Sequence, residues 1–365
     1  MKGVHMNDRI FNFSPGPATL PVSVLETARD EMLNFRGEGL SVMEMSHRSK
    51  TFEGILNEAA DSVKKVVGFS DNYSVLFLQG GATGQFAAVP LNLAIKGNPG
   101  LYVNTGAWSK KAISEAKKLG IDYKVVASSE DKNFNYIPEN IDLGSDGSYL
   151  HITSNNTIFG TQWADYPNTG NIPLVADMSS DIYCRRFDPD LFGLIYAGAQ
   201  KNAGPAGVTI VIIRNDLLDR SPENIPTIFN YKIFAEQNSL YNTPNCYGIY
   251  IVGLVMKWIL DQDGIDKLEA INKKKADLIY KTLDGTDFFR PTAASDSRSI
   301  MNITFRLPAE DLEKKFISDA TAAGLAGLKG HRSVGGIRAS IYNAMQLAGV
   351  ESLVNFMQTF EKQNG

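Results

Sequence analysis

Short apolar runs alternate with helix-like stretches through the middle of this 365-residue chain, and this alternation limits the possible folds more than any other feature. The runs show little polar alternation, so they suit strands that are covered on both faces. The intervening residues 85–95 and 109–119 have helical spacing. The pattern predicts an α/β fold with a mostly parallel central sheet flanked by helices. The expected strands are 74–79, 100–104, 149–153, 172–177, 194–197 and 208–214.

The last third of the chain has a different pattern, with longer helices and fewer strands. The predicted elements are helices at 247–262, 265–283 and 312–323 and strands at 301–307 and 340–342. We therefore expect a large domain over residues 18–262 and a smaller C-terminal α+β domain over residues 263–365. The N-terminal segment 1–17 is expected to pack with the small domain or with the active site.

Composition and charge disfavour several classes of function. The 36 lysines and arginines face 40 aspartates and glutamates, so no basic face for nucleic acid is expected. No apolar run reaches the roughly 18 residues of a membrane span, and the N-terminus lacks the order of a signal peptide. The two cysteines and four histidines show no disulfide framework and no ligand spacing for a metal. These features predict a cytoplasmic protein without a metal site or a membrane partner.

One lysine, Lys201, stands among small residues directly after a short apolar run. A deprotonated lysine there can form a Schiff base with an aldehyde, although a lysine taken alone is more often a solvated loop residue. Asp177 ends the preceding apolar run, at the end of a strand where α/β proteins bind ligands. A carboxylate there can hold a protonated pyridine nitrogen. Together the two residues predict pyridoxal phosphate (PLP) as cofactor, while Asp177 alone could also be a helix N-cap, because Ser179 and Ser180 follow.

A glycine-rich turn, GGATG at residues 80–84, lies between a predicted strand and a predicted helix. Backbone N–H groups at a helix N-terminus bind phosphate, but such turns also serve packing alone. The turn matches neither the dinucleotide nor the P-loop fingerprint, so no nicotinamide or nucleoside triphosphate site is expected. Trp108 follows another predicted strand. We expect its indole to stack on the pyridine ring, the alternative being a core tryptophan.

Six stretches, spread in order over nearly the whole chain, carry a family resemblance. They read FNFSPGPATLP (11–21), SHRSK (46–50), GQFAAVPLNL (84–93), IYAGAQKNAGPAGVTIVI (195–212), YNTP (241–244) and KGHRSVGGIRASIYNA (329–344). On these stretches the sequence resembles the phosphoserine aminotransferases, which are class-V, fold-type I PLP enzymes. The resemblance implies reversible amino transfer between L-glutamate and 3-phosphooxypyruvate, giving O-phospho-L-serine and 2-oxoglutarate in serine biosynthesis. Some members also act on 4-phosphohydroxythreonine in pyridoxine biosynthesis.

The resemblance assigns the catalytic and cofactor-binding residues by position. It implies that Lys201 is the Schiff-base lysine, which also moves the substrate proton, and that Asp177 is the partner of the pyridine nitrogen. The other implied cofactor residues are Ala82 and Thr83 in the phosphate loop, Trp108 on the ring, Thr157 near the phenolate oxygen, Gln200 at the phosphate, and Asn242 and Thr243. The last pair matches residues that reach the phosphate from the neighbouring subunit, which implies a homodimer with shared active sites.

Two histidines and three arginines are implied to bind the substrate. His47 and Arg48 match residues that bind its distal anionic group. His331 and Arg332 match a pair that the partner subunit contributes to the phosphate pocket, and Arg338 matches the arginine that holds the α-carboxylate. The chemistry agrees, because arginine binds carboxylate and phosphate bidentately. The alternative for His331 and Arg332 is a solvated loop.

Two positions depart from part of the family, and related activities stay open. Some members carry an arginine where this chain has Thr83, and a serine where it has Pro15. Without that arginine, one cation near the substrate phosphate is missing. The alternatives are other class-V PLP enzymes, such as an alanine–glyoxylate aminotransferase or a cysteine desulfurase. A desulfurase needs a mobile cysteine, but Cys184 and Cys246 lie in no predicted catalytic loop.

Overall fold

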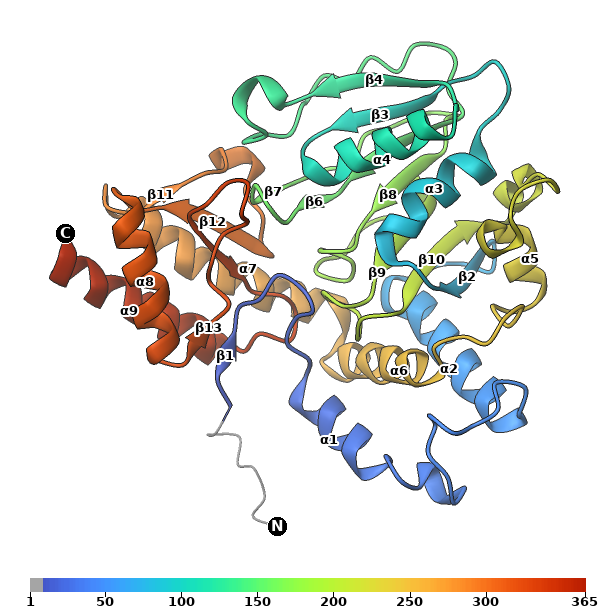
Figure 1. The fold of residues 1–365 in the computed structure, drawn as a ribbon, viewed down its shortest axis with the longest axis horizontal. Helices are drawn as coiled ribbons and strands as arrows, with labels where there is room; N and C mark the ends of the chain where they lie inside the picture. Colours follow the sequence, from blue (N-terminus) through green and yellow to red (C-terminus); the bar gives the residue numbers. More distant parts are fainter. Residues whose placement is uncertain (1–8) are drawn as a thin grey trace.

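A seven-stranded sheet forms the middle of the molecule (Figure 1), and the computed structural model describes it together with the rest of residues 9–365. The strand order is β2-β10-β9-β8-β5-β3-β4. β10 runs antiparallel to both its neighbours, whereas the pairs from β9 to β4 are parallel, so the predicted mostly parallel sheet is confirmed. The strands are β2 (Tyr73–Leu78), β3 (Gly100–Asn104), β4 (Tyr123–Ser128), β5 (Tyr149–Thr153), β8 (Leu174–Asp177), β9 (Phe192–Gly198) and β10 (Thr209–Arg214).

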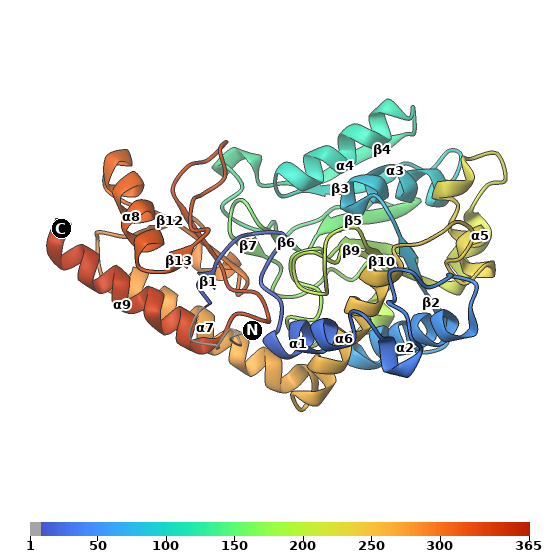
Figure 2. The same cartoon turned by 60° about the horizontal axis from the view of Figure 1, so that its bottom comes forward.

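Helices cover both faces of this sheet (Figure 2). α3 (Gly81–Leu93), α4 (Ala107–Lys118) and α5 (Tyr231–Glu236) lie on one face, and α1 (Val22–Asp30), α2 (Lys50–Val67) and α6 (Cys246–Asp261) on the other. Alternate side chains of a strand point to opposite faces. In β2, Leu76 and Leu78 therefore pack under α3, while Val75 and Phe77 join the core beneath α2 and α6. This double cover explains why the strands read as continuous apolar runs.

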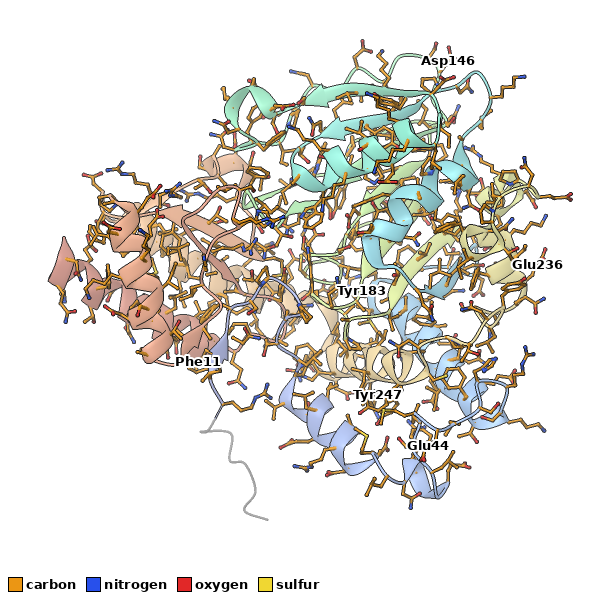
Figure 3. All side chains as sticks on the ribbon, viewed as in Figure 1. Phe11, Glu44, Asp146, Tyr183, Glu236 and Tyr247 are labelled. Carbon is orange, nitrogen blue, oxygen red and sulfur yellow. The ribbon has the colours of Figure 1, made fainter. Side chains whose placement is uncertain are left out.

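A second unit, with a core of its own, is built from the C-terminal part of the chain and the N-terminal segment. Its elements are β1 (Phe11–Asn12), α7 (Gly264–Asp284), β11 (Arg290–Pro291), β12 (Asn302–Arg306), α8 (Glu310–Ala322), β13 (Leu325–Ala326), β14 (Ile337–Ser340) and α9 (Leu347–Asn364). β11, β12 and β14 form an antiparallel sheet, and β1 pairs with β13. Phe11 packs against the core of this unit, and Tyr183 belongs to the core of the large sheet (Figure 3). Asn343 Nδ2 donates to the Tyr183 carbonyl at 2.9 Å and so connects the two units. Residues 1–8 of the predicted N-terminal segment lie outside the described residues.

Short elements connect the larger ones. They are the β6 (Asn155–Asn156) and β7 (Thr161–Gln162) hairpin and 3-10 helices at Phe35–Gly37, Glu130–Lys132, Pro189–Leu191, Asn215–Arg220, Thr227–Phe229 and Ser295–Ser297. Within residues 9–365, none of the helices combines the length and apolar character that crossing a bilayer requires.

Two predicted elements begin three or four residues away from the position that the sequence indicated, more than the others. The helix expected from residue 85 begins at Gly81, because Gly80 and Gly81 adopt positive φ (94° and 60°) and turn the chain from β2 directly into the helix. The strand expected at 340–342 lies three residues earlier at its start: it is β14, which spans Ile337–Ser340. It begins right after Gly336, whose φ is +71°. Its Arg338 interrupts the apolar run, but Ile337 and Ala339 face the small core and the charged side chain faces the other way.

Candidate active site

The carboxyl ends of five strands meet at one edge of the large sheet. β2 and β9 are both antiparallel to β10, so they run in the same direction as β8, β5 and β3. The turn at Gly80 follows β2, Trp108 follows β3, Asp177 ends β8, and Lys201 follows β9. This edge is where open α/β sheets bind ligands, so the topology brings the predicted cofactor residues into one region.

Lys201 is mostly buried at this edge. Its Nζ donates a hydrogen bond to Thr157 Oγ1 at 2.8 Å and lies 5.4 Å from the centroid of the Trp108 ring. Burial lowers the pKa of Lys201 to about 8, and the nearby negative charge of Asp177 partly opposes this shift. A substantial part of the amine is therefore neutral near physiological pH, which a nucleophilic or proton-transferring lysine requires.

Asp177 is 5% exposed and accepts a hydrogen bond at Oδ1 from the backbone N–H of Ser179 at 3.0 Å. Burial raises its pKa, while the Ser179 hydrogen bonds and the charge on Lys201 oppose the rise. No helix begins here, so the N-cap alternative for Asp177 is wrong: the carboxylate closes a turn instead. Among the described residues Asp177 forms no salt bridge, and such a carboxylate suits a cationic group brought by a ligand.

The N-terminus of α3 offers free backbone donors at the same edge. Gly80 is the N-cap of the helix. The first hydrogen bond of the helix runs from the Gly84 N–H to the Gly80 carbonyl, at 3.0 Å. The N–H groups of the first turn, which holds Ala82 and Thr83, have no partner within the helix and favour an anion. Thr243 lies beside this turn, because Gln79 Nε2 donates to its carbonyl at 3.3 Å.

The N-terminal segment and the second unit close the region around Lys201. A Cβ at Gly16 would lie 3.1 Å from Lys201 Cγ, and the N–H of Ala18 donates to the Gln200 carbonyl at 2.8 Å. Arg338 on β14 is 6% exposed, and its Nη1 donates to the Thr157 carbonyl at 3.3 Å. Burial lowers the pKa of Arg338. Among the described residues, Arg338 Nε and Trp108 Nε1 are buried without a hydrogen-bond acceptor, as expected of donors that bind a ligand.

The comparisons with known proteins agree with this arrangement. The sequence model of the family described as Aminotransferase class-V matches residues 10–353. The chain belongs to the class-V aminotransferases. It is 56% identical to the phosphoserine aminotransferase of Desulfatibacillum aliphaticivorans over 361 residues, covering 99% of this chain and 100% of that one. Identity to the enzyme of the same name from Geobacillus kaustophilus is 51% over 358 residues, or 97% of this chain and 99% of the relative.

Solved structures show the same likeness. The phosphoserine aminotransferase from Bacillus circulans subsp. alkalophilus superposes with a TM-score of 0.96 at 49% identity, covering 98% of this chain and 100% of that one. A PLP-bound phosphoserine aminotransferase from Trichomonas vaginalis gives a TM-score of 0.91 at 37% identity, with 96% and 100% covered. The predicted fold-type I architecture of this class-V aminotransferase is therefore confirmed.

His331 and Arg332 lie in the loop before β14, and His331 Nδ1 shares a hydrogen bond with Ser333 Oγ at 2.7 Å. Burial lowers the pKa of His331, and the positive charges of Arg338, Arg332 and Lys111 lower it further. Lys111 was not predicted. It stands one helical turn after Trp108 on α4, with Nζ 4.5 Å from the indole centroid, and the i, i+3 spacing in the sequence is the signal that could have pointed to it.

Two further pairs of predicted residues have contacts elsewhere in the described chain. His47 and Arg48 lie between α1 and α2, where the N–H of Arg48 donates to Ser46 Oγ at 3.3 Å. Asn242 Nδ2 donates to the Thr243 carbonyl at 3.3 Å. The roles predicted for these two pairs stay predictions.

The two cysteines do not resemble catalytic thiols. Cys184 is fully buried, and Gln162 Nε2 donates to its Sγ at 3.5 Å. Burial raises the pKa of the Cys184 thiol far above its usual range and raises that of Cys246, the first residue of α6. Thiols that resist deprotonation are poor nucleophiles, which disfavours the desulfurase alternative.

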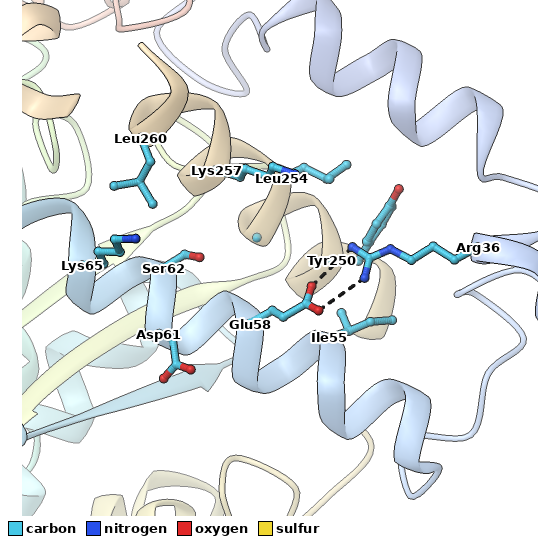
Figure 4. A pocket seen from close by; sticks show the side chains of 11 residues that line it. Arg36, Ile55, Glu58, Asp61, Ser62, Lys65, Tyr250, Leu254, Lys257 and Leu260 are labelled. Carbon is cyan, nitrogen blue, oxygen red and sulfur yellow. Dashed lines mark hydrogen bonds and ion pairs between the residues drawn. The ribbon is translucent and has the colours of Figure 1, made fainter. Parts of the chain in front are cut away.

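A groove between α2 and α6 (Figure 4) holds none of the predicted site residues. It is lined by charges of both signs, and Arg36 donates to both carboxylate oxygens of Glu58 at 3.3 Å. The guanidinium of Arg36 is half-exposed, so this ion pair is a surface contact. The groove lies on the helix layer opposite α3 and α4 and is separate from the site at Lys201.

Proposed function

We propose that this class-V aminotransferase is a PLP-dependent phosphoserine aminotransferase. It transfers the amino group between L-glutamate and 3-phosphooxypyruvate, giving O-phospho-L-serine and 2-oxoglutarate in serine biosynthesis. The observation that carries the proposal is Lys201, whose amine has a pKa of about 8 and lies at Thr157 and Trp108 near the buried carboxylate of Asp177. Its relatives of that name, which match over nearly the whole chain, support the choice of substrate.

The residues present fit PLP at three of its groups. The free N–H groups of α3 suit its phosphate, and the amine of Lys201 suits its aldehyde. The carboxylate of Asp177, which forms no salt bridge within residues 9–365, suits its ring nitrogen. We propose that Ala82, Thr83, Trp108, Thr157, Asp177, Gln200, Lys201, Asn242 and Thr243 hold the cofactor. When bound, PLP supplies an electron sink for the negative charge left at Cα after deprotonation.

The chain's own groups supply the proton transfer and orient the substrate. The neutral amine of Lys201 would take the proton from the substrate Cα and carry it as general base and acid. Burial penalises an unpaired charge on Asp177. A positive partner offsets this penalty and keeps the carboxylate anionic. Arg338 binds the α-carboxylate through donors that include its unpartnered Nε. This contact fixes the direction of the Cα–H bond relative to the base.

The remaining cations bind the far end of the substrate. We assign His47, Arg48, His331 and Arg332 to the phosphate of phosphoserine and to the side-chain carboxylate of glutamate. 4-Phosphohydroxythreonine carries the same phosphate and amino acid ends and is proposed as a second substrate. The protein acts as a cytoplasmic homodimer, with one domain over residues 18–262 and another over 263–365. Asn242, Thr243, His331 and Arg332 serve the site of the neighbouring subunit.

The test is a half-reaction followed by the absorbance of the bound cofactor. Glutamate added to the PLP-loaded wild type changes the spectrum, 3-phosphooxypyruvate restores it, and phosphoserine alone produces the same change as glutamate. In Arg332→Ala, the reaction with phosphoserine weakens more than that with glutamate, whereas Arg290→Ala, an exposed arginine on β11, leaves both unchanged. A wild type that responds to glutamate but not to phosphoserine would contradict the substrate assignment.

A further inference from the structure

Glu313, in the first turn of α8, is a buried carboxylate that the catalytic region does not use. It is 6% exposed and accepts hydrogen bonds from Arg306 Nε at 2.5 Å and Nη2 at 3.3 Å. The backbone N–H groups of Leu307 and Gly336 also donate to it, at 3.3 Å and 3.2 Å. A buried carboxylate with this many donors is held in one position, since charge-assisted hydrogen bonds are among the strongest in proteins.

The loop over residues 330–336, which carries His331 and Arg332, is closed on itself. The N–H groups of Val334 and Gly335 donate to the His331 carbonyl at 2.9 Å and 2.8 Å, and that of Gly330 donates to the Gly336 carbonyl at 2.9 Å. Two further hydrogen bonds leave the loop: Arg306 Nη1 donates to the Val334 carbonyl at 3.1 Å, and Gly336 donates to Glu313. In the part of the chain that the structure describes, these two are the hydrogen bonds that tie residues 330–336 to other elements.

The backbone of this loop also packs directly on the Arg306 side chain. A Cβ at Gly336, where φ is +71°, would lie 2.6 Å from Arg306 Cδ and 2.7 Å from the Phe305 carbonyl oxygen. A Cβ at Gly330 would lie 2.0 Å from the Gly335 carbonyl oxygen. Glycine is therefore required at both positions in this conformation, and at Gly336 the loop backbone lies directly against the Arg306 side chain.

We propose that Glu313 and Arg306 form a clasp that positions His331 and Arg332 for the phosphate end of the substrate. The inference rests on the proposed function, and it adds two residues that act through the loop without touching substrate. The physical reason is preorganisation: an exposed loop rich in glycine orders its cations before binding only if other elements fix it. The binding of phosphoserine depends on the clasp more than the binding of glutamate does, because the phosphate carries more charge and more acceptor oxygens for these cations.

Glu313→Gln tests the clasp by removing the charge at nearly constant shape. We expect the KM for phosphoserine to rise about tenfold to a hundredfold, the effect of losing a hydrogen bond to a charged group. The KM for glutamate and both kcat values should change far less, since the variant leaves Lys201 and Arg338 in place. Glu310→Gln is the matched control, because Glu310 lies on the same helix turn and lines the same pocket as Glu313 and His331, but its side chain is exposed. Equal KM values for phosphoserine in the two variants would overturn the proposal.

A second measurement does not depend on turnover. Hydrogen–deuterium exchange in the peptide over residues 329–337 should speed up in Glu313→Gln and stay at the wild-type rate in Glu310→Gln. If Glu313→Gln does not fold, Arg306→Met serves instead, because it keeps the packing on Gly336 and removes the hydrogen bonds to Val334 and Glu313. Unchanged exchange in the folded variant would refute the clasp. A wild type without phosphoserine turnover would refute the proposed function alone, because the exchange measurement still tests the clasp.

Discussion

At the scale of single residues, the proposed chemistry depends on the charge of Lys201. Burial lowers its pKa to about 8, and Asp177 opposes that shift by favouring the charged amine. In Asp177→Asn we therefore expect a still lower pKa, so that the neutral amine appears at lower pH. The measurement is the pH dependence of reductive methylation of Lys201 in the apoenzyme, read by mass spectrometry. Asp146→Asn, an exposed residue (Figure 3) at the amino end of β5, opposite the strand ends that carry the site, should not move the midpoint. An upward shift in Asp177→Asn would contradict the electrostatic account.

The same lysine gives the largest expected loss of activity. Lys201→Ala removes the group that moves the Cα proton, so kcat should fall by about a thousandfold, within the range that proton transfer contributes. Steady-state amino transfer from glutamate to 3-phosphooxypyruvate is the measurement. Lys232→Ala, which removes an exposed lysine paired with Asp219, is the control and should keep wild-type turnover. A Lys201→Ala protein that turned over normally would overturn the assignment.

At the scale of elements, the sequence predicts strands well where both faces are buried. β3 and β5 begin and end where their apolar runs do, because every residue in them is buried. β4 is largely exposed at the sheet edge and has no such run, which is why the sequence does not reveal it. The site follows the same rule: Lys201 and Asp177 stand next to buried strands and are predictable. Lys111 and Glu313 are not, since their contacts depend on how α4 and α8 face their neighbours.

One buried lysine joins α7 to the segment that follows β14. Lys275 is 0% exposed, and its Nζ lies within hydrogen-bonding distance of the carbonyl oxygens of Ile341, Tyr342 and Met345, at 2.9, 2.8 and 3.1 Å. Lys275→Met leaves all three carbonyls without this donor, so the free energy of unfolding should fall by about 3 kcal/mol or more. Urea denaturation measures the change. Lys274→Met, at the exposed neighbouring position, should stay close to wild type.

The same lysine makes stability depend on pH. Burial lowers the pKa of Lys275 from 10.5 to about 7, so between these values the unfolded chain binds more protons than the folded one. The free energy of unfolding of the wild type should therefore rise with pH across this window relative to Lys275→Met. Urea midpoints at a series of pH values, with Lys274→Met beside them, measure the difference. A difference between wild type and Lys275→Met that stays constant with pH would contradict the lowered pKa.

At the scale of the whole molecule, α7 and a buried polar network connect the two cores. Ile265 and Leu268, near the start of α7, pack in the core of the large sheet, whereas Ile279 belongs to the second core. The change of core therefore occurs inside α7, a little after the proposed boundary at residue 262. Asn343 connects the second unit directly to the active-site region, because its backbone N–H donates to Oδ1 of Asn202, the residue after Lys201, at 2.9 Å. Displacement of the second unit would thus disturb the chain beside the lysine.

The proposed sharing of sites between subunits concerns the whole assembly, and a mixed dimer can test it. Within residues 9–365, Asn242 Nδ2 and Gln79 Nε2 both donate to the Thr243 carbonyl, and neither Asn242 nor Thr243 forms a hydrogen bond with Lys201. If they serve the neighbouring subunit, a dimer of one Lys201→Ala chain and one Asn242→Ala/Thr243→Ala chain has one site with every residue intact. Such a dimer should show about half the activity of the wild-type dimer, although each parent dimer is impaired at both sites.

The control for this experiment is a mixed dimer in which each chain carries a defect in its own active site. A dimer of Lys201→Ala and Asp177→Asn chains has one defective residue in each site whichever subunit supplies Asn242 and Thr243, so mixing should restore no activity. Both mixtures are refolded together from denaturant, and activity is measured per mixed dimer after separation by affinity tags. Recovery in the first mixture alone requires that the pair act across the interface. Failure of both mixtures would place Asn242 and Thr243 in the site of their own chain, next to the α3 turn that Gln79 already links to Thr243.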